Sequence, residues 1–226
     1  FKYYLKTAWR NLLKQKVFSI INVLGLAIGI AVAFLIMNYV SHEFSYDDFH
    51  KKKDRIYRVE SQFYEGNNLT DDWGTSTFGY GSAMEKELPG IEDFVRISIH
   101  ETEQVVKYGD YKVREDGVVY TEPSFFHIFD YKLLEGNKET ALSKVNSLVI
   151  TASAAKQFFG NESPMGKTLR FLRSDRFVDC IITGVMEDFP ANSHIHFKYL
   201  IAYEGLPVWM KDFWYLHEAY TYVLLQ

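Results

Sequence analysis

The sequence predicts a membrane-anchored protein of the α+β class: an N-terminal amphipathic helix and a single transmembrane helix, followed by a mixed α/β extracytoplasmic domain. Three observations lead to this prediction. Residues 17–40 form an apolar run without a charged residue, histidine or proline. The sixteen residues before this run carry five cations and no acidic residue. The 186 residues after it combine short β-rich runs with a few short helical segments, and they suffice for one sizeable domain.

The first sixteen residues predict an amphipathic helix. Apolar side chains such as Phe1, Trp9 and Leu13 recur at helical spacing, and cations recur every four residues on a different face. Such a helix suits the inner membrane surface, with its cations beside anionic lipid. A merely basic flanking tail is the alternative. The expected membrane-interface residues are Lys2, Lys6, Trp9, Arg10, Lys14 and Lys16.

Residues 17–40 predict the transmembrane helix. At ~1.5 Å per residue, these 24 residues exceed the roughly 20 that cross the hydrocarbon of a bilayer. The helix of a soluble core rarely runs this long without a charge. A signal peptide would have a shorter apolar run and a small-residue cleavage site after it. Gly25 and Gly29 form a GxxxG pair on one face, where another helix could approach closely.

The charges on either side of this helix predict its orientation. The whole chain carries −4 and the first sixteen residues carry +5, so the remainder carries −9. The positive-inside rule then places the N-terminus in the cytoplasm and the large domain on the other side of the membrane. The predicted division is a cytoplasmic helix over residues 1–16, the span over 17–40 and an extracytoplasmic domain over 41–226, which the family resemblance described below implies is periplasmic.

The outer domain predicts mixed α+β structure. Gly109-Asp110 between two β-rich runs is typical of a hairpin turn, and Gly160 after an apolar helical segment is typical of a C-terminal helix cap. Residues 66–81 are rich in Gly, Asn, Asp, Thr and Ser, which favours a loop. The expected strands are 55–63, 103–108, 111–116, 118–121, 148–151, 168–172, 177–185, 197–203 and 220–225, and the expected helices are 82–88, 124–129 and 152–159.

Two groups of residues have side chains of the kinds that bind metals. The first follows the membrane helix and contains His42, Glu43, Asp47, Asp48 and His50. Aromatic residues are interleaved through it, so a solvated collar on an emerging helix is the better interpretation. The second consists of His194 and His196, with Asp188 upstream, and is typical of surface histidines at the start of a strand. We predict no metal site and no cofactor.

Gly160–Thr168 superficially resembles a phosphate-binding P-loop. Five residues separate its first glycine from the Gly-Lys pair, whereas the P-loop requires four. The segment also follows a predicted helix and leads into a predicted strand, the reverse of a P-loop. The single cysteine, Cys180, lies among apolar residues and is expected in the core. No catalytic constellation is evident, and the net acidic outer domain argues against nucleic acid.

Several segments of the sequence resemble segments of a known protein family, which the composition alone could not indicate. The N-terminal KTAWRNLLKQKVFSIINVLGLAIGIAVAFLI resembles the opening of MacB-type ABC transporter permeases, which include the FtsX-like and lipoprotein-releasing permeases. Four downstream segments are similar to the periplasmic core domain of that family, in the same order and spacing. These are SFFHIFDYKLLEGN at 124–137, SLVITASAAKQFFG at 147–160, SPMGKTLRF at 163–171 and ITGVMEDFPANSHIHF at 182–197.

The resemblance implies a non-catalytic permease subunit of the inner membrane. Such permeases work as dimers with a separate cytoplasmic ABC ATPase, whose ATP-driven closure moves the periplasmic domains, and a periplasmic partner protein can be involved. Family members have three further membrane helices, so we expect this chain to be the N-terminal portion of a longer permease. A single-pass sensor or ligand-binding module is the alternative from a different class, and a membrane-anchored enzyme is a weaker one. The handled substrate is not encoded in these residues.

Overall fold

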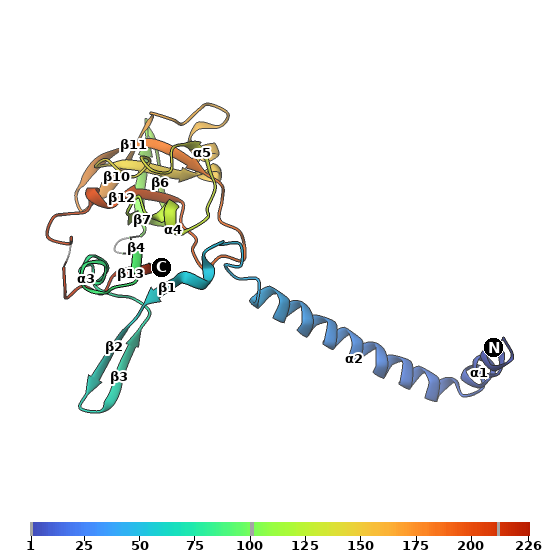
Figure 1. Cartoon of the computed structure of the whole chain (residues 1–226). Coiled ribbons are helices and arrows are strands. Elements are labelled where there is room, and N and C mark those ends of the chain that lie inside the picture. The colour runs from blue at the N-terminus through green and yellow to red at the C-terminus, as the bar shows by residue number, and fades with distance from the viewer. Residues whose placement is uncertain (1, 100–101, 212) are drawn as a thin grey trace. The chain divides into compact units, whose positions relative to one another are not determined.

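The computed structural model describes residues 2–99, 102–211 and 213–226 of the chain (Figure 1). The chain forms two compact units, Phe1–Tyr46 (unit 1) and Asp47–Gln226 (unit 2). In the described residues, unit 1 contains only helices and unit 2 contains every strand. The predicted α+β class, with an N-terminal apolar helix before a sheet-rich domain, is therefore confirmed.

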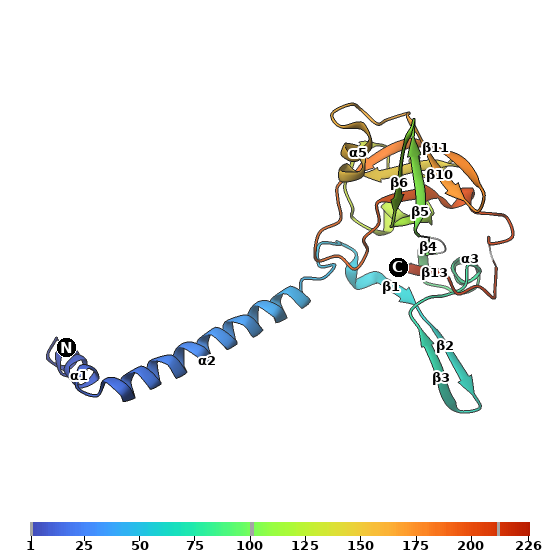
Figure 2. The same cartoon turned by 180° about the vertical axis from the view of Figure 1, so that it is seen from behind.

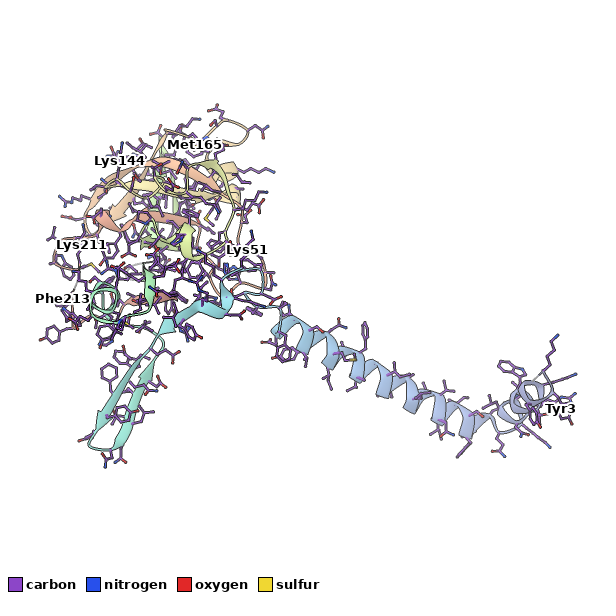
Figure 3. All side chains as sticks on the ribbon, in the orientation of Figure 1. Tyr3, Lys51, Lys144, Met165, Lys211 and Phe213 are labelled. Carbon is purple, nitrogen blue, oxygen red and sulfur yellow. The ribbon has the colours of Figure 1, made fainter. Side chains whose placement is uncertain are left out.

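Unit 1 consists of helices α1 (Lys2–Lys14) and α2 (Lys16–Glu43). No residue of α2 is buried, and its side chains project on all sides of the ribbon (Figure 3). Within the described chain, α2 is the one helix long and apolar enough to cross a membrane. Phe1, which we placed on the amphipathic helix, lies outside the described residues. The division at residues 16 and 40 refers to the membrane and stays a prediction.

Unit 2 is built on a large mixed sheet that Figures 1 and 2 show from opposite sides. Its eleven strands run in the order β1-β13-β4-β7-β12-β9-β11-β10-β5-β6, with β8 paired to β11. The pairs β7–β12 and β9–β11 are parallel and the other pairs are antiparallel. The strands are β1 (Ile56–Val59), β4 (Ile91–Ser98), β5 (Gln104–Tyr108), β6 (Tyr111–Glu115), β7 (Val118–Thr121), β8 (Leu133–Gly136), β9 (Ser147–Thr151), β10 (Thr168–Arg173), β11 (Arg176–Met186), β12 (Tyr199–Ala202) and β13 (Ala219–Leu225).

A hydrophobic core covers each face of this sheet. Side chains of a strand alternate between faces, so Leu148 and Ile150 of β9 join one core while Val149 joins the other. Strands β7 and β12 divide in the same way, and all their residues are buried. Apolar runs without polar alternation are typical of strands covered on both sides. Cys180 lies fully buried in the first core, as predicted.

In its described residues, unit 2 also contains three α-helices: α3 (Tyr80–Glu87), α4 (Phe125–Ile128) and α5 (Ala152–Phe159). The sequence determines both ends of α5. The Thr151 hydroxyl accepts a hydrogen bond from the Ala154 N–H at 3.4 Å, and Gly160 ends the helix at a φ of 60°. Residues 152–159 were predicted as this helix, and the hairpin around Gly109-Asp110 is also confirmed.

Two predictions fail where a second, small sheet forms. The expected strand at 55–63 is broken at Glu60 into β1 and β2 (Ser61–Glu65), which belong to different sheets. The expected loop at 66–81 contains β3 (Asn68–Trp73), which pairs with β2, and the first residues of α3. The β2–β3 hairpin projects away from the large sheet (Figure 1). Every residue of β3 is exposed, so the strand has no apolar face and its polar sequence is typical of a loop.

Strands β4 and β8 were not predicted. Strand β4 lies between β13 and β7 although it contains Glu92, Asp93 and Arg96. The Arg96 side chain is buried, and its Nε donates to the Glu122 carboxylate at 2.6 Å. A charged residue can occupy such a strand only with a partner of this kind. That partner is 26 residues away in the sequence, so local patterning could not identify it.

Candidate functional site

The predicted membrane-interface residues lie on α1 and at the start of α2, and all of them are exposed. Trp9 and Lys16 line one groove in the angle between the two helices. The structure does not bring Lys2, Lys6, Arg10 and Lys14 into that groove. A Cβ atom at Gly25 or Gly29 would meet nothing within 4 Å, so this face of α2 is open in unit 1. A helix contact there stays a prediction.

The segment that begins unit 2 is held by a set of polar contacts that starts at Asp47. Asp47 adopts a φ of 57°, a left-handed conformation that aspartate tolerates better than most residues. Its backbone N–H donates to the carbonyl of Asn192 at 2.9 Å. Its carboxylate accepts from the His194 backbone N–H at 3.2 Å and lies 2.5 Å from His194 Nδ1.

His194 continues this chain of contacts into the large sheet. Its Nε2 lies 2.6 Å from the hydroxyl of Tyr222, which is buried on β13. Burial raises the pKa of Tyr222, so its hydroxyl stays protonated and can donate. We call the three residues Asp47, His194 and Tyr222 the anchor clamp. They connect the residue next to unit 1 with the strand that pairs with both β1 and β4.

His50 adds a second attachment one turn later. Its ring is buried against Phe49, Phe129 and Tyr131. The Asp130 backbone N–H donates to His50 Nδ1 at 3.0 Å, so Nδ1 is an acceptor and the neutral ring carries its proton on Nε2. Burial lowers the pKa of His50, which favours this neutral form.

Two neighbours strengthen the second attachment. The Lys51 backbone N–H donates to the Asp130 carboxylate at 2.7 Å, and Lys52 Nζ donates to the His127 carbonyl at the same distance. Figure 3 labels Lys51, which lies at the beginning of unit 2. The first residues of unit 2 are thus fixed directly to two segments, those around residues 130 and 194, and through His194 to Tyr222.

The anchor clamp borders a cleft of about 380 Å³ that both charged and apolar residues line. The cleft has no nucleophile activated by a base, because the third member of the clamp is a tyrosine whose pKa is raised by burial. No three potential metal ligands come together among the described residues. The arrangement can hold a chain segment in place, and that is the role we assign to it. The lining residues are Asp47, His50, Lys53, Ile56, Arg58, Glu60, Phe129, His194 and Tyr222.

Sequence reasoning named Asp47, His50 and His194 but placed them in two unrelated groups. The structure joins the groups, and it separates His196 from His194: His196 lines another cleft with Asp188 and Ser153. The reasoning missed Tyr222 and Asp130. Tyr220 and Tyr222 are two positions apart in the last strand, so both hydroxyl groups lie on one face of the sheet. This spacing was the available sequence signal for a polar group on a buried face.

The segment that resembles a P-loop connects α5 with β10, the reverse of the order in a phosphate-binding loop. Lys167, the residue at the position of a phosphate-binding lysine, pairs with the Glu162 carboxylate at 2.5 Å. It also lies 4.9 Å from the centre of the Phe159 ring. These contacts assign the segment a structural role.

Comparison with known proteins identifies the family. The profile described as MacB-like periplasmic core domain matches residues 19–226. A domain described as part of a permease protein from Porphyromonas gingivalis is similar, with 26% identity, a TM-score of 0.66, and coverage of 78% of this chain and 77% of that one.

The periplasmic region of MacB from Actinobacillus actinomycetemcomitans has a similar fold, with 17% identity and a TM-score of 0.50 over 67% of this chain and 66% of that one. No curated protein matches the sequence. An apolar helix precedes a domain of a periplasmic family, so the protein is membrane-anchored with an extracytoplasmic domain. The chain belongs to the MacB-like periplasmic core domain family, which confirms the resemblance found in its sequence.

Proposed function

We propose that this chain is the membrane subunit of a MacB-type ABC transporter and transmits movement from a cytoplasmic ATPase to the periplasm. One observation carries the proposal: the anchor clamp joins Asp47, the first residue of unit 2, to the large sheet through contacts of 2.5 and 2.6 Å. A displacement of Asp47 would then be passed to β13 through these side chains.

The proposal includes the orientation and the partners. The N-terminus lies in the cytoplasm of a cell with an inner membrane, and unit 2 lies in the periplasm. Two copies work together, with an ABC ATPase subunit inside and a periplasmic partner protein outside. The chain itself catalyses no reaction. The five cations of residues 1–16 support this orientation through the positive-inside rule.

Affinity purification from native membranes tests the proposal. An ABC ATPase should co-purify with the chain, and its ATP hydrolysis should depend on the chain. The variant Asp47→Asn should retain the ATPase but reduce the coupling of hydrolysis to any downstream activity. A chain that purifies without an ATPase would favour a single-pass sensor or binding module.

A further inference from the structure

The angle between α1 and α2 forms an apolar groove of about 410 Å³. This volume lies within the roughly 300–1,000 Å³ typical of ligand sites. Helix α1 contributes Trp9, Leu12 and Leu13, and α2 contributes residues at positions 16, 19, 20, 23 and 24. Both sets have the spacing of a single helical face, so the groove is made by two aligned stripes.

A hydrogen bond fixes the angle between the helices. The Ser19 hydroxyl donates to the Leu12 carbonyl at 2.9 Å, across the junction at Gln15. Gln15 leaves the helical conformation, with φ of −110° and ψ of 59°. The carbonyl of Leu12 belongs to the last turn of α1, where carbonyl groups lack partners within the helix. The groove is therefore a defined feature of unit 1.

The groove changes in character from one end to the other. Lys16 lies where α2 begins and Trp9 lines the groove from α1, whereas Val23 and Leu24 lie about two turns further along α2. Tryptophan and lysine at a helix end are typical of the headgroup level of a bilayer. The deeper lining is aliphatic and exposed, with Val23 and Leu24 more than half accessible. This gradient from cationic to apolar matches a phospholipid.

The charge of the site is not balanced within unit 1. The first acidic residue of the sequence is Glu43, at the far end of α2 from Lys16. No carboxylate of unit 1 can therefore pair with Lys16. A phosphate group at headgroup depth would supply the missing negative charge.

We propose that the groove between α1 and α2 binds one anionic phospholipid of the inner leaflet. Its phosphate pairs with Lys16, and an acyl chain lies along Leu12, Ile20 and Leu24. The site would fix α1 against the membrane surface. This proposal depends on the membrane location given under the proposed function.

Native mass spectrometry of the full chain in detergent tests the proposal, with equal amounts of dioleoyl phosphatidylglycerol and dioleoyl phosphatidylcholine as probes. Phosphatidylglycerol should be retained preferentially. Lys16→Gln should reduce its retention by about fivefold, the equivalent of ~1 kcal/mol for one cation near an anionic headgroup. The control Lys2→Gln removes an exposed cation outside the groove and should change retention much less.

A second pair of variants tests the apolar part. Val23→Phe fills the groove and should reduce retention of both lipids, whereas Ile30→Phe adds the same ring outside the groove and should not. The proposal would be overturned if Lys16→Gln and Lys2→Gln reduced the retention of phosphatidylglycerol equally, or if the wild type retained the two lipids equally. It would also be overturned if Val23→Phe and Ile30→Phe changed lipid retention equally. Membrane flotation of each variant separates these outcomes from failure of the membrane location itself, which would also overturn the proposal.

Discussion

The carboxylate of Asp47 lies 2.5 Å from Nδ1 of His194, although 147 positions separate the two residues in the sequence. This contact joins the first residue of unit 2 to a segment that precedes β12. Through the hydroxyl of Tyr222 it reaches β13, which pairs with both β1 and β4. The first residue of unit 2 is thereby attached to the large sheet by side chains as well as by the backbone.

Asp47→Asn tests the strength of the anchor clamp. Asparagine tolerates the positive φ at this position, so the change removes the charge with little backbone strain. Charged hydrogen bonds contribute about 1.5–3 kcal/mol, and the half-buried location of this pair reduces that to about 1–2 kcal/mol. The melting temperature should fall by about 2–8 °C. Asp48→Asn is the matched control, because Asp48 is exposed and its loss should change the melting temperature by less than about 2 °C.

His50 makes the stability of unit 2 dependent on pH. Burial lowers the pKa of His50 below its ordinary value of 6.5, so the unfolded chain takes up this proton more readily than the folded chain. Above pH 6.5 His50 is mainly neutral in both the folded and the unfolded chain, so its titration does not reduce the free energy of unfolding. That free energy decreases as the pH falls from 6.5 toward the pKa of His50 in the folded chain. The slope contributed by one proton is at most about 1.4 kcal/mol per pH unit.

Denaturant unfolding at several pH values between 5 and 7.5 measures this slope. His50→Leu should make the slope shallower. Phe49→Leu, which changes the adjacent packing without a titratable group, should lower stability but keep the wild-type slope. An unchanged slope in His50→Leu would show that another group is responsible.

The buried pair of Arg96 and Glu122 gives a third prediction. Arg96→Met should lower the free energy of unfolding by about 3–5 kcal/mol, because it leaves the Glu122 carboxylate buried without the arginine side chain. Burial raises the pKa of Glu122 even beside Arg96, so the carboxylate should take up a proton once the arginine is removed. Calorimetry of Arg96→Met, Glu122→Met and the double variant checks this. The double variant should be more stable than Arg96→Met, and strict additivity of the two single changes would contradict the account.

These elements show how much of the molecule local patterning can predict. Helix α5 and strand β7 were predicted at their observed bounds, because an N-cap, a C-cap glycine and a continuous apolar run are local signals. Strand β4 was missed because its buried arginine depends on a distant carboxylate. The anchor clamp was missed for the same reason. Its residue types were visible in the sequence, but their proximity results from the order of strands in the sheet.

Cys180 should be inert in the folded protein. The thiol is fully buried, and burial raises its pKa to about 12, so very little thiolate exists at neutral pH. A maleimide reagent should label the wild type only after unfolding. Asp175→Cys places a thiol in the exposed turn between β10 and β11 and should react rapidly without denaturant. Labelling of folded wild type at a similar rate would show that the core around β11 opens readily.

This inert cysteine allows the central claim to be tested by a single measurement. The Asp175→Cys variant can be spin-labelled in the complete complex with its ATPase, in nanodiscs, and the distance between labels on the two copies measured by pulsed electron paramagnetic resonance. We predict that the distance distribution differs between the nucleotide-free and ATP-bound states, and that Asp47→Asn reduces this difference. Identical distributions in both states of the labelled complex would contradict a role in transmitting movement to the periplasmic domain.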